Sequence, residues 1–309
     1  MYNGVIIVNK EAGFTSHDVV AKLRGILKQK KIGHTGTLDP DATGVLPVCL
    51  GHATKLCDML TDKDKTYEAV MLLGRITDTQ DTSGKTLSES DVEALRESGG
   101  LKDEIILEAI HSFIGEYDQI PPMYSALKVN GKKLYELARE GIEIERKARP
   151  VVINSIESIS IDFPRVTMTV SCSKGTYIRT LCHDIGEKLG CGACMDKLKR
   201  TKVSTFTIEN ALKLDEISDI AKAESGMENY IIPVEKIFES YRVANTKKEY
   251  DRLIYNGNSL YSNMVELKDK TKPEDNEAVK MYDSNGKFMG IFVYDKKTRM
   301  FKVEKMFFV

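Results

Sequence analysis

The segment Gly33–Gly44 (GHTGTLDPDATG) places the carboxylate of Asp39 among glycines, threonines and a proline. Glycine allows backbone angles that other residues resist, and Pro40 fixes its own φ and disfavours the helical region for the residue before it. We therefore expect a constrained loop that holds the Asp39 side chain in a set direction. An ordinary turn, in which Asp and Pro are common, explains the same composition equally well.

Three other segments carry side chains that could complete a site around Asp39. Tyr67 begins an apolar strand pattern, Tyr177 and Arg179 follow the glycine of a strand-to-helix turn, and residues 198–203 (LKRTKV) have the pattern of a basic strand edge. We expect Arg179 to keep Asp39 ionised through a charge-assisted pair and the aromatic rings to stack on a base. Taken singly, Tyr67 also fits a half-buried strand residue, and Arg179 fits a surface charge.

These side chains need regular elements to position them. Apolar residues at helical spacing predict a helix ahead of the loop, with Ser16 as its N-cap. A nearly continuous apolar run over 67–73 predicts a strand, and alternation over 151–161 and 166–172 predicts a pair of strands. The remaining predicted elements are a first strand within residues 1–10 and helices over 53–60, 91–97, 104–113, 180–189 and 209–223.

The pattern changes near residue 241, where short apolar runs begin to alternate with polar turns. Asn285-Gly286 is a strong hairpin signal between predicted strands at 278–282 and 288–294. A further strand is expected from Met300. We therefore predict a main domain over residues 1–238 and a small, separate β-rich domain over residues 239–309.

The chain has 309 residues and a net charge of −1, but its charges are segregated. Residues 61–120 carry 6 basic and 14 acidic side chains, residues 121–205 carry 15 and 9, and residues 241–309 carry 14 and 10. A basic surface can neutralise phosphates even when the whole chain is slightly acidic. Scattered, solvated lysines are the alternative interpretation of these counts.

The composition excludes several classes of protein. No apolar run approaches the roughly 18 residues that span a bilayer, and no basic segment precedes the N-terminal apolar stretch, so we expect neither a membrane span nor a signal peptide. The six cysteines are then expected to be reduced thiols in a cytoplasmic protein. Cys191 and Cys194 form a lone CxxC pair, which falls short of the four ligands of a zinc site.

Several blocks of the sequence together resemble one family. The Gly33–Gly44 segment, continued by Val45-Leu46-Pro47, resembles the signature of the bacterial tRNA pseudouridine-55 synthases, the TruB family. So do Lys65-Thr66-Tyr67 and the segments 77–84, 121–128 and 175–179, in the family's order. The matching blocks extend from about Lys10 to Phe206. One departure is Lys10-Glu11, where the family usually has Lys-Pro.

The resemblance implies a fold and a division into domains. The fold class would be α+β, with a mixed, mainly antiparallel sheet flanked by helices, followed by a small β-rich domain that resembles a short PUA-type RNA-binding domain. The family implies tRNA as partner, bound through its T arm, and a monomer with no obligate protein partner. Neither a metal nor another cofactor is implied.

The implied reaction is the isomerisation of uridine-55 in the tRNA T-loop to pseudouridine, after the base has flipped out of the loop. Asp39 would be the nucleophile, and attack on C6 of the ring, attack on C1′ of the ribose and proton abstraction all remain open. Arg179 would pair with Asp39 and orient it. Tyr67 would stack on the base and is a candidate for the late removal of the C5 proton.

The resemblance implies further residues of the substrate pocket. By their places in the matching blocks, His34, Tyr177, Leu198, Lys10 and Asp81 would bind the substrate, and His34 could fill the space that the flipped base leaves. Two alternatives remain: a protein of this fold that binds and remodels tRNA, and a guide-RNA-dependent relative. The second is disfavoured because this chain carries its own RNA-binding extension.

Overall fold

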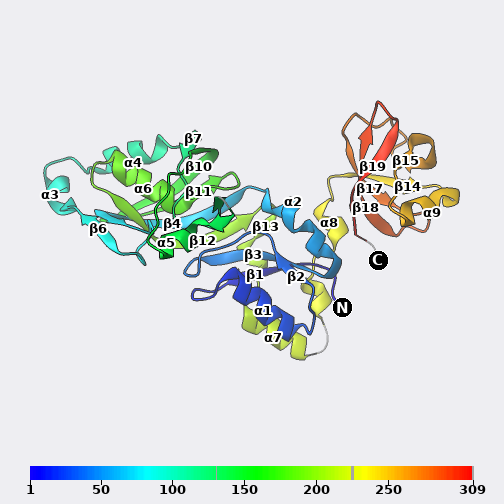
Figure 1. The fold of residues 1–309 in the computed structure, drawn as a ribbon, viewed down its shortest axis with the longest axis horizontal. Helices are drawn as coiled ribbons and strands as arrows, with labels where there is room; N and C mark the ends of the chain where they lie inside the picture. The colour runs from blue at the N-terminus through cyan, green and yellow to red at the C-terminus, as the bar shows by residue number, and fades with distance from the viewer. Residues whose placement is uncertain (130, 224–225, 308–309) are drawn as a thin grey trace.

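The computed structural model describes residues 1–129, 131–223 and 226–307. Its main layer is a nine-stranded sheet that runs along the length of the larger lobe (Figure 1). The order is β1-β3-β12-β4-β11-β10-β7, with β2 paired to β3 and β13 paired to β12. These strands are β1 (Gly4–Lys10), β2 (Ile32–His34), β3 (Thr43–Leu50), β4 (Lys65–Leu73), β7 (Gly115–Gln119), β10 (Arg149–Asp162), β11 (Arg165–Cys172), β12 (Ala193–Val203) and β13 (Phe206–Thr207).

The sheet is mixed but mainly antiparallel, as the family resemblance implied. Its one parallel pair among the described strands, β3 with β12, sets Arg200 beside Gly44. The predicted strand pair 151–161 and 166–172 is confirmed as antiparallel β10 and β11. The alternation of buried and more accessible residues in β11 indicates that this part of the sheet packs only one face on a core.

Helices cover the two halves of the sheet. α1 (Ser16–Ile26) and α7 (Leu214–Lys222) share a core with β1 and β3, whereas α4 (Asp103–His111) and α6 (Ile178–Lys188) pack on the half that contains β4, β10, β11 and β12. The other helices are α2 (Cys57–Thr61), α3 (Val92–Glu97), α5 (Leu134–Arg139), α8 (Val234–Ile237) and α9 (Asp251–Tyr255), with 3₁₀ turns at Gly51–Leu56, Ile208–Asn210, Met227–Tyr230, Lys248–Tyr250 and Ser262–Met264.

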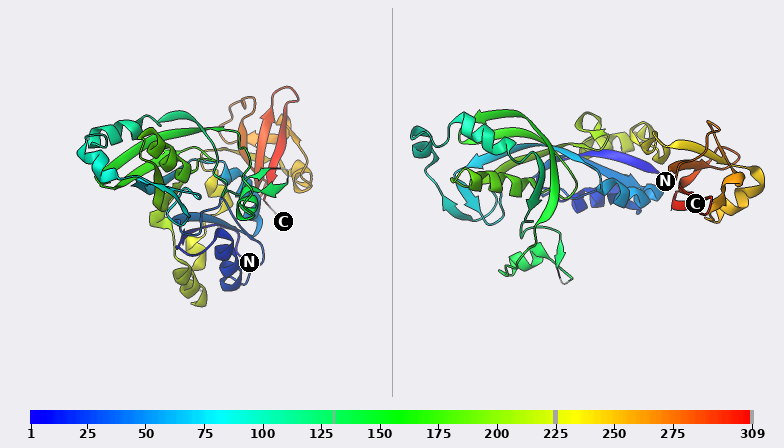
Figure 2. Two further views of the ribbon diagram at one scale, coloured as in Figure 1. Left: turned by 60° about the vertical axis from the view of Figure 1, so that its left-hand side comes forward. Right: turned by 90° about the horizontal axis from the view of Figure 1, so that it is seen from above.

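Two small hairpins form sheets of their own beside the main sheet. One pairs β5 (Arg75–Thr77) with β6 (Thr86–Glu89), and the other pairs β8 (Lys128–Val129) with β9 (Lys132–Lys133). The second hairpin and α5 project from the body, as the right-hand view of Figure 2 shows in green. Their own small core, formed by Met123, Leu134 and Leu137, is separate from the main one.

The C-terminal part forms a second sheet of six strands in the order β15-β19-β18-β17-β14-β16. The predicted hairpin is confirmed as β17 and β18, and its core is separate from those of the main sheet. Phe307 and Ile291 nevertheless pack with Phe238 against the back of β1 and β3. The strands are β14 (Arg242–Thr246), β15 (Leu260–Tyr261), β16 (Val265–Leu267), β17 (Ala278–Tyr282), β18 (Phe288–Asp295) and β19 (Met300–Met306).

Two local predictions near the loop are wrong. Thr15, not Ser16, is the N-cap of α1, and its side chain accepts the backbone N–H of Asp18. Residues 198–203 are not a strand edge, because β12 lies between β3 and β4. Two bulges in its pairing with β4 turn Lys197, Lys199 and Lys202 to one face and Leu198 and Arg200 to the other.

The helix boundaries also differ in places. Residues 53–60 form a 3₁₀ turn followed by the short helix α2, and the predicted helix 209–223 splits into a 3₁₀ turn and α7. The predicted helices 91–97, 104–113 and 180–189 are confirmed as α3, α4 and α6, each shifted by one or two residues at one or both ends. Among the described residues, no helix is long and apolar enough to cross a membrane.

Candidate active site

The centre of the Asp39 loop (residues 33–44) is irregular, as its composition predicts, although its two ends belong to β2 and β3. Its backbone is held from the α1 side: the N–H of Leu38 donates to Oγ of Ser16 over 2.9 Å, and the N–H of Gly13 donates to the carbonyl of Pro40 over 3.0 Å. Although Ser16 is not the helix cap, it has another role. It fixes the residue that precedes Asp39.

Arg200 holds the loop from the side of the sheet. Its side chain is buried, with Nε donating to the carbonyl of Val45 over 2.8 Å and Nη2 donating to that of Gly36 over 3.3 Å. One guanidinium thus joins the start of the loop to its end. Gly44 allows the backbones of β3 and β12 to come close together at Arg200. Its φ is +103°, and a Cβ there would lie 2.1 Å from the carbonyl oxygen of Arg200.

Lys10 lies beneath the same loop and is fully buried. Its ammonium donates to the carbonyls of Glu11, Pro40 and Ala42 over 3.0, 2.8 and 2.6 Å. Burial lowers the pKa of Lys10 to about 8, and the nearby Asp41 and Asp39 carboxylates oppose the shift. The structure therefore places Lys10 behind the loop, where it reaches a substrate only through the backbone that it holds.

Asp39 and Arg179 form a two-point ion pair. Nε of Arg179 lies 3.0 Å from Oδ2 of Asp39, and Nη2 donates to Oδ1 over 3.3 Å. The guanidinium is nearly buried, with 6% of its side chain exposed, whereas 40% of the Asp39 side chain is exposed. Such a fork fixes the carboxylate in the plane of the guanidinium and leaves one of its faces open.

The rest of the Arg179 guanidinium is held by two other segments. Nη1 donates to the carbonyl of Thr79 over 3.0 Å and lies 3.8 Å from Oδ2 of Asp81, and Nη2 donates to the carbonyl of Tyr124 over 2.9 Å. Oδ1 of Asp81 accepts bonds from Thr79 and Ser83. The segments around residues 79, 124 and 179, far apart in sequence, therefore converge on one cation.

Two opposing effects set the pKa of Asp39. Desolvation by the surrounding loops raises the pKa, and Asp81 adds to the rise, while the Arg179 guanidinium and the Lys10 ammonium oppose it. The net effect is a raised pKa for Asp39. The side chain nevertheless remains 40% exposed and receives two contacts from Arg179, which favour the ionised carboxylate.

Tyr67 lies on β4 directly opposite Arg200 of β12. The ring is buried and packs in the core that also contains Leu38 and Ala42 of the loop. Burial raises the pKa of the phenol, while the charge of Arg200 and its hydrogen bond to the phenol oppose this rise. Arg200 thus connects the phenol of Tyr67 with both ends of the Asp39 loop.

The remaining predicted pocket residues lie around this centre. His34 ends β2, and its ring meets that of His17 edge-on at 5.3 Å. Tyr177 is the N-cap of α6, and its backbone is held at both N–H and carbonyl by the side chain of Gln119. Leu198 packs against the core beside the Tyr67 strand. Burial lowers the pKa of His34, which favours the neutral imidazole.

Comparisons with known proteins identify the family. The model of the TruB family pseudouridylate synthase N-terminal domain matches residues 24–178, and that of the tRNA pseudouridylate synthase B C-terminal domain matches residues 179–239. Proteins named tRNA pseudouridine synthase B from Lachnoclostridium phytofermentans and Clostridium perfringens are 52% and 46% identical, over 99% and 98% of both chains. The chain belongs to the TruB family of pseudouridylate synthases.

Solved structures agree with this TruB assignment. A chain in the structure of an H/ACA RNP bound to a substrate RNA containing 2′-deoxyuridine matches 99% of this chain with 85% of its own length, at a TM-score of 0.72 and 25% identity. A chain in a Cbf5-Nop10-Gar1 complex matches 99% of this chain with 85% of its own, at a TM-score of 0.71 and 26% identity. The predicted enzyme class, an isomerase that forms pseudouridine, and the predicted fold are therefore confirmed.

Sequence reasoning missed several residues of this candidate site. Arg200 lies within the segment that the sequence predicts as an exposed basic edge, and its one signal is its position two residues after Leu198, in a strand where side chains alternate. Gln119 and His17 give no signal at all.

Cys191 and Cys194, the residues of the CxxC pair, are buried, and burial raises the pKa of the Cys194 thiol to about 11.

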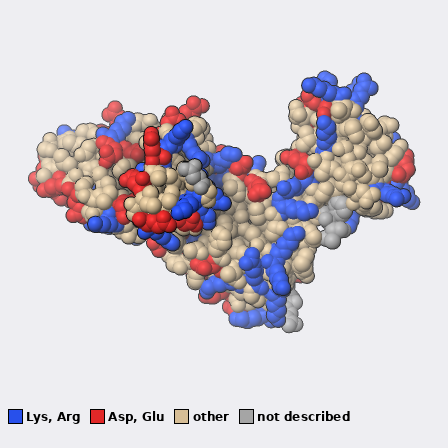
Figure 3. Space-filling view, in the orientation of Figure 1, with Lys and Arg blue, Asp and Glu red and all other residues tan. Residues whose placement is uncertain are grey.

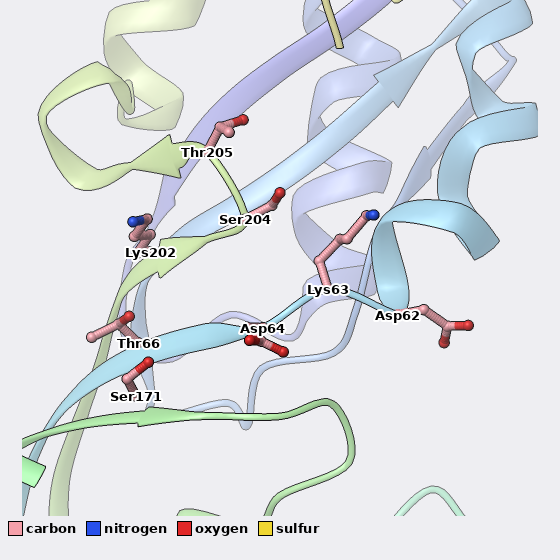
Figure 4. Close-up of a pocket in the computed structure, with 8 residues that line it drawn as sticks. All are labelled: Asp62, Lys63, Asp64, Thr66, Ser171, Lys202, Ser204 and Thr205. Atoms are coloured by element: carbon pink, nitrogen blue, oxygen red, sulfur yellow. The ribbon is translucent and has the colours of Figure 1, made fainter. Parts of the chain in front are cut away.

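A cavity of about 490 Å³ lies on the other face of the sheet from this site. Figure 4 shows its lining side chains at the β4, β11 and β12 ends. Thr66 and Lys202, which pair across β4 and β12, line it, whereas Tyr67 and Arg200, which pair one step further along, belong to the site. The cavity is therefore not part of the Asp39 site. Its lining residues are Asp62, Lys63, Asp64, Thr66, Ser171, Lys202, Ser204 and Thr205.

Proposed function

We propose that this chain converts uridine-55 in the T-loop of tRNA into pseudouridine. The observation that carries the proposal is the half-exposed Asp39 carboxylate, held in a fixed plane by the buried Arg179 guanidinium. Relatives that share 46% to 52% identity are named tRNA pseudouridine synthase B, which supports tRNA as the substrate.

The reaction is an isomerisation, so its atoms balance without a co-reactant. The bond from ribose C1′ to N1 of uracil breaks, the base turns, and C1′ joins to C5. The proton that C5 loses is balanced by the proton that N1 gains. Asp39 acts as the nucleophile, and attack on C6 and attack on C1′ both satisfy this balance. The target base must first leave the folded loop, at a cost of a few kcal/mol.

Each neighbouring side chain then has a defined part. Arg179 orients Asp39 and keeps it ionised. Tyr67 stacks on the flipped base and is the candidate for removal of the C5 proton. The Arg200 guanidinium beside it opposes the rise that burial causes in the pKa of its phenol. His34, Tyr177, Leu198 and Asp81 contribute to the walls of the pocket, and Lys10 acts by holding the loop.

We further propose the domain division and the partners. Residues 1–238 form the catalytic body and residues 239–309 a short PUA-like domain that binds RNA backbone; the main sheet ends at Thr207 and the second begins at Arg242. The enzyme works as a monomer in the cytoplasm without cofactor. A guide-RNA-dependent mode is less well supported, because the matching chains in ribonucleoprotein structures share 25% and 26% identity with this chain.

The test is Asp39→Asn. We expect pseudouridine formation to fall by on the order of 10³-fold or more, because the neutral amide is not a nucleophile, while tRNA binding stays within a few-fold. Release of label from C5 of uridine in a T-arm transcript measures turnover, and mapping of pseudouridine gives the site. Near-normal turnover by the variant contradicts the nucleophile assignment, and product at another uridine contradicts the substrate position. Turnover that is absent in the wild type, with tight tRNA binding, favours the remodelling alternative.

A further inference from the structure

A second set of cationic side chains lies at the opposite end of β2 and β3 from Asp39. Arg24 is near the end of α1, Lys28, Lys30 and Lys31 lie between α1 and β2, and Lys55 lies in the 3₁₀ turn that follows β3. All five are exposed. We call them the β2 basic surface. In Figure 3, blue side chains gather over α1 and β2, below the notch beside the C-terminal sheet.

Backbone contacts hold these residues together. Nε of Arg24 donates to the carbonyl of Lys30 over 3.1 Å, and the N–H of Gly51 donates to the carbonyl of Lys31 over 2.8 Å. The pKa of His52 is lowered by burial and by the charges of Lys31 and Lys55, which shows that both cations face the same place. The five cations are therefore clustered on ordered elements, with their side chains exposed.

The charge of this surface is not paired within the part of the chain that the structure describes. None of its five cations forms an ion pair with any residue that the structure describes. Lys55 links it to another region, because its ammonium donates to the carbonyl of Met306 in β19 over 2.9 Å. Exposed, unpaired cations clustered on one surface are typical of a site for nucleic-acid phosphates.

The position of the surface indicates which part of the RNA it meets. β3 runs from the Asp39 loop at Thr43 to Leu50, a span of about 23 Å at ~3.3 Å per residue. β2 and β3 lead from that loop toward the C-terminal sheet (Figure 1). A nucleic-acid duplex carries roughly one phosphate charge per 1.7 Å of its axis. We take the T-loop to be seated at Asp39 and its stem to follow β3. The phosphates that reach this surface then lie beyond the first base pairs of the stem.

We propose that the β2 basic surface binds the backbone of the tRNA acceptor stem, which stacks on the T stem and continues it. The contact extends RNA binding beyond the T arm and bridges the catalytic body and the C-terminal sheet. The inference rests on the proposed function, since it takes the T-loop to be seated at Asp39. It needs no sequence readout, because lysine contacts to phosphates position a duplex without reading its bases.

The test compares two RNAs on one variant. Lys28→Gln, Lys30→Gln and Lys31→Gln are combined in the full-length chain, and binding is measured with whole tRNA and with an isolated T-arm hairpin between about 50 and 200 mM salt. We expect about tenfold weaker binding of whole tRNA, and a log–log salt slope smaller by about 2, since each lost phosphate contact removes roughly 0.7 to 0.9. Hairpin binding and its single-turnover rate should stay within about twofold.

A matched control removes the same charge elsewhere. Lys85, Lys102 and Lys222 are exposed lysines outside this surface, and the combined Gln variant should bind both RNAs like the wild type. Unchanged binding of whole tRNA by the Lys28, Lys30 and Lys31 variant overturns the inference. Equal weakening for both RNAs overturns the acceptor-stem assignment. If the wild type modifies neither RNA, the proposed function fails; if it modifies both, any failure belongs to this inference alone.

Discussion

Positively charged side chains lie near both ends of β3, but they are buried at one end and exposed at the other. Near Thr43, Lys10 and Arg200 are buried and donate to the carbonyls of the Asp39 loop. Near Leu50, Lys30 and Lys31 are exposed and form no ion pair with a described residue. A buried cation loses its hydration and fixes geometry in return. An exposed cation keeps its hydration and attracts phosphates without fixing anything.

The comparison predicts that the positions of the cationic groups matter at the end of β3 near Asp39. At the other end, near Leu50, only their charge should matter. Arg179→Lys keeps the charge beside Asp39 but loses the two-point contact and the bonds to the carbonyls of Thr79 and Tyr124. We expect turnover to fall by about 10²-fold or more, with tRNA binding little changed. The measurement is single-turnover pseudouridine formation at saturating enzyme. The matched change at the other end, Lys30→Arg, should leave both turnover and binding within about twofold.

Either of these two variants can contradict the comparison. If Arg179→Lys keeps near-normal turnover, charge alone suffices at the Asp39 end. A Lys30→Arg enzyme with impaired binding means that the surface requires a fixed geometry after all. Thermal unfolding of both variants must accompany the assay, because Arg179 also joins three segments of the fold.

Gly44 tests how closely the first end is packed. Its φ is +103°, and a Cβ at this position would lie 2.1 Å from the carbonyl oxygen of Arg200, so there is no room for a side chain. We expect Gly44→Ala to lower the free energy of unfolding by at least about 3 kcal/mol, through backbone strain and overpacking. Gly25 is the control, since a Cβ there meets nothing within 4 Å. Gly25→Ala, within α1, should be stabilising by about 0.5 to 1 kcal/mol. Equal stabilities of the two variants in urea contradict the close approach of β3 and β12.

Part of the Asp39 end could be predicted. The glycines and Pro40 predicted the irregular loop from local backbone preferences, whereas the pair of Arg179 with Asp39, 140 residues apart, was expected from opposite charge and from the family resemblance. The two cations that hold the loop could not be assigned in this way. Lys10 ends a strand and Arg200 lies in a lysine-rich segment, and both types of residue are usually exposed.

The burial of Lys10 and Arg200 depends on pairing between strands that are far apart in the sequence. β12 inserts between β3 and β4, and the bulges that turn Arg200 inward exist only in that pairing. The error at the helix cap has the same origin: Ser16 and Thr15 are both good caps, and only the contact with Leu38 shows that Ser16 serves the loop. The C-terminal hairpin, by contrast, was predictable because Asn-Gly acts through local backbone geometry.

The smallest expected effect is the pH dependence that Lys10 contributes. Its pKa is about 8 in the folded protein, against an ordinary value of 10.5, because burial penalises the charged form. Below pH 8 the ammonium is charged in both states, and the penalty is present in full. Between pH 8 and 10.5 the folded protein releases this proton while the unfolded chain keeps it, so the stability contribution of Lys10 rises with pH.

We therefore compare the free energy of unfolding of the wild type with that of Lys10→Met across this range. The difference, wild type minus variant, should increase from pH 8 to 10.5 by up to about 3 kcal/mol, and subtraction removes the titration of other groups. Lys85→Met, at an exposed position, should show no such trend. A difference that falls with pH means that the folded protein stabilises the ammonium and raises its pKa. A flat difference means that Lys10 is solvated. In that case the two ends of β3 do not differ in how they hold their charge.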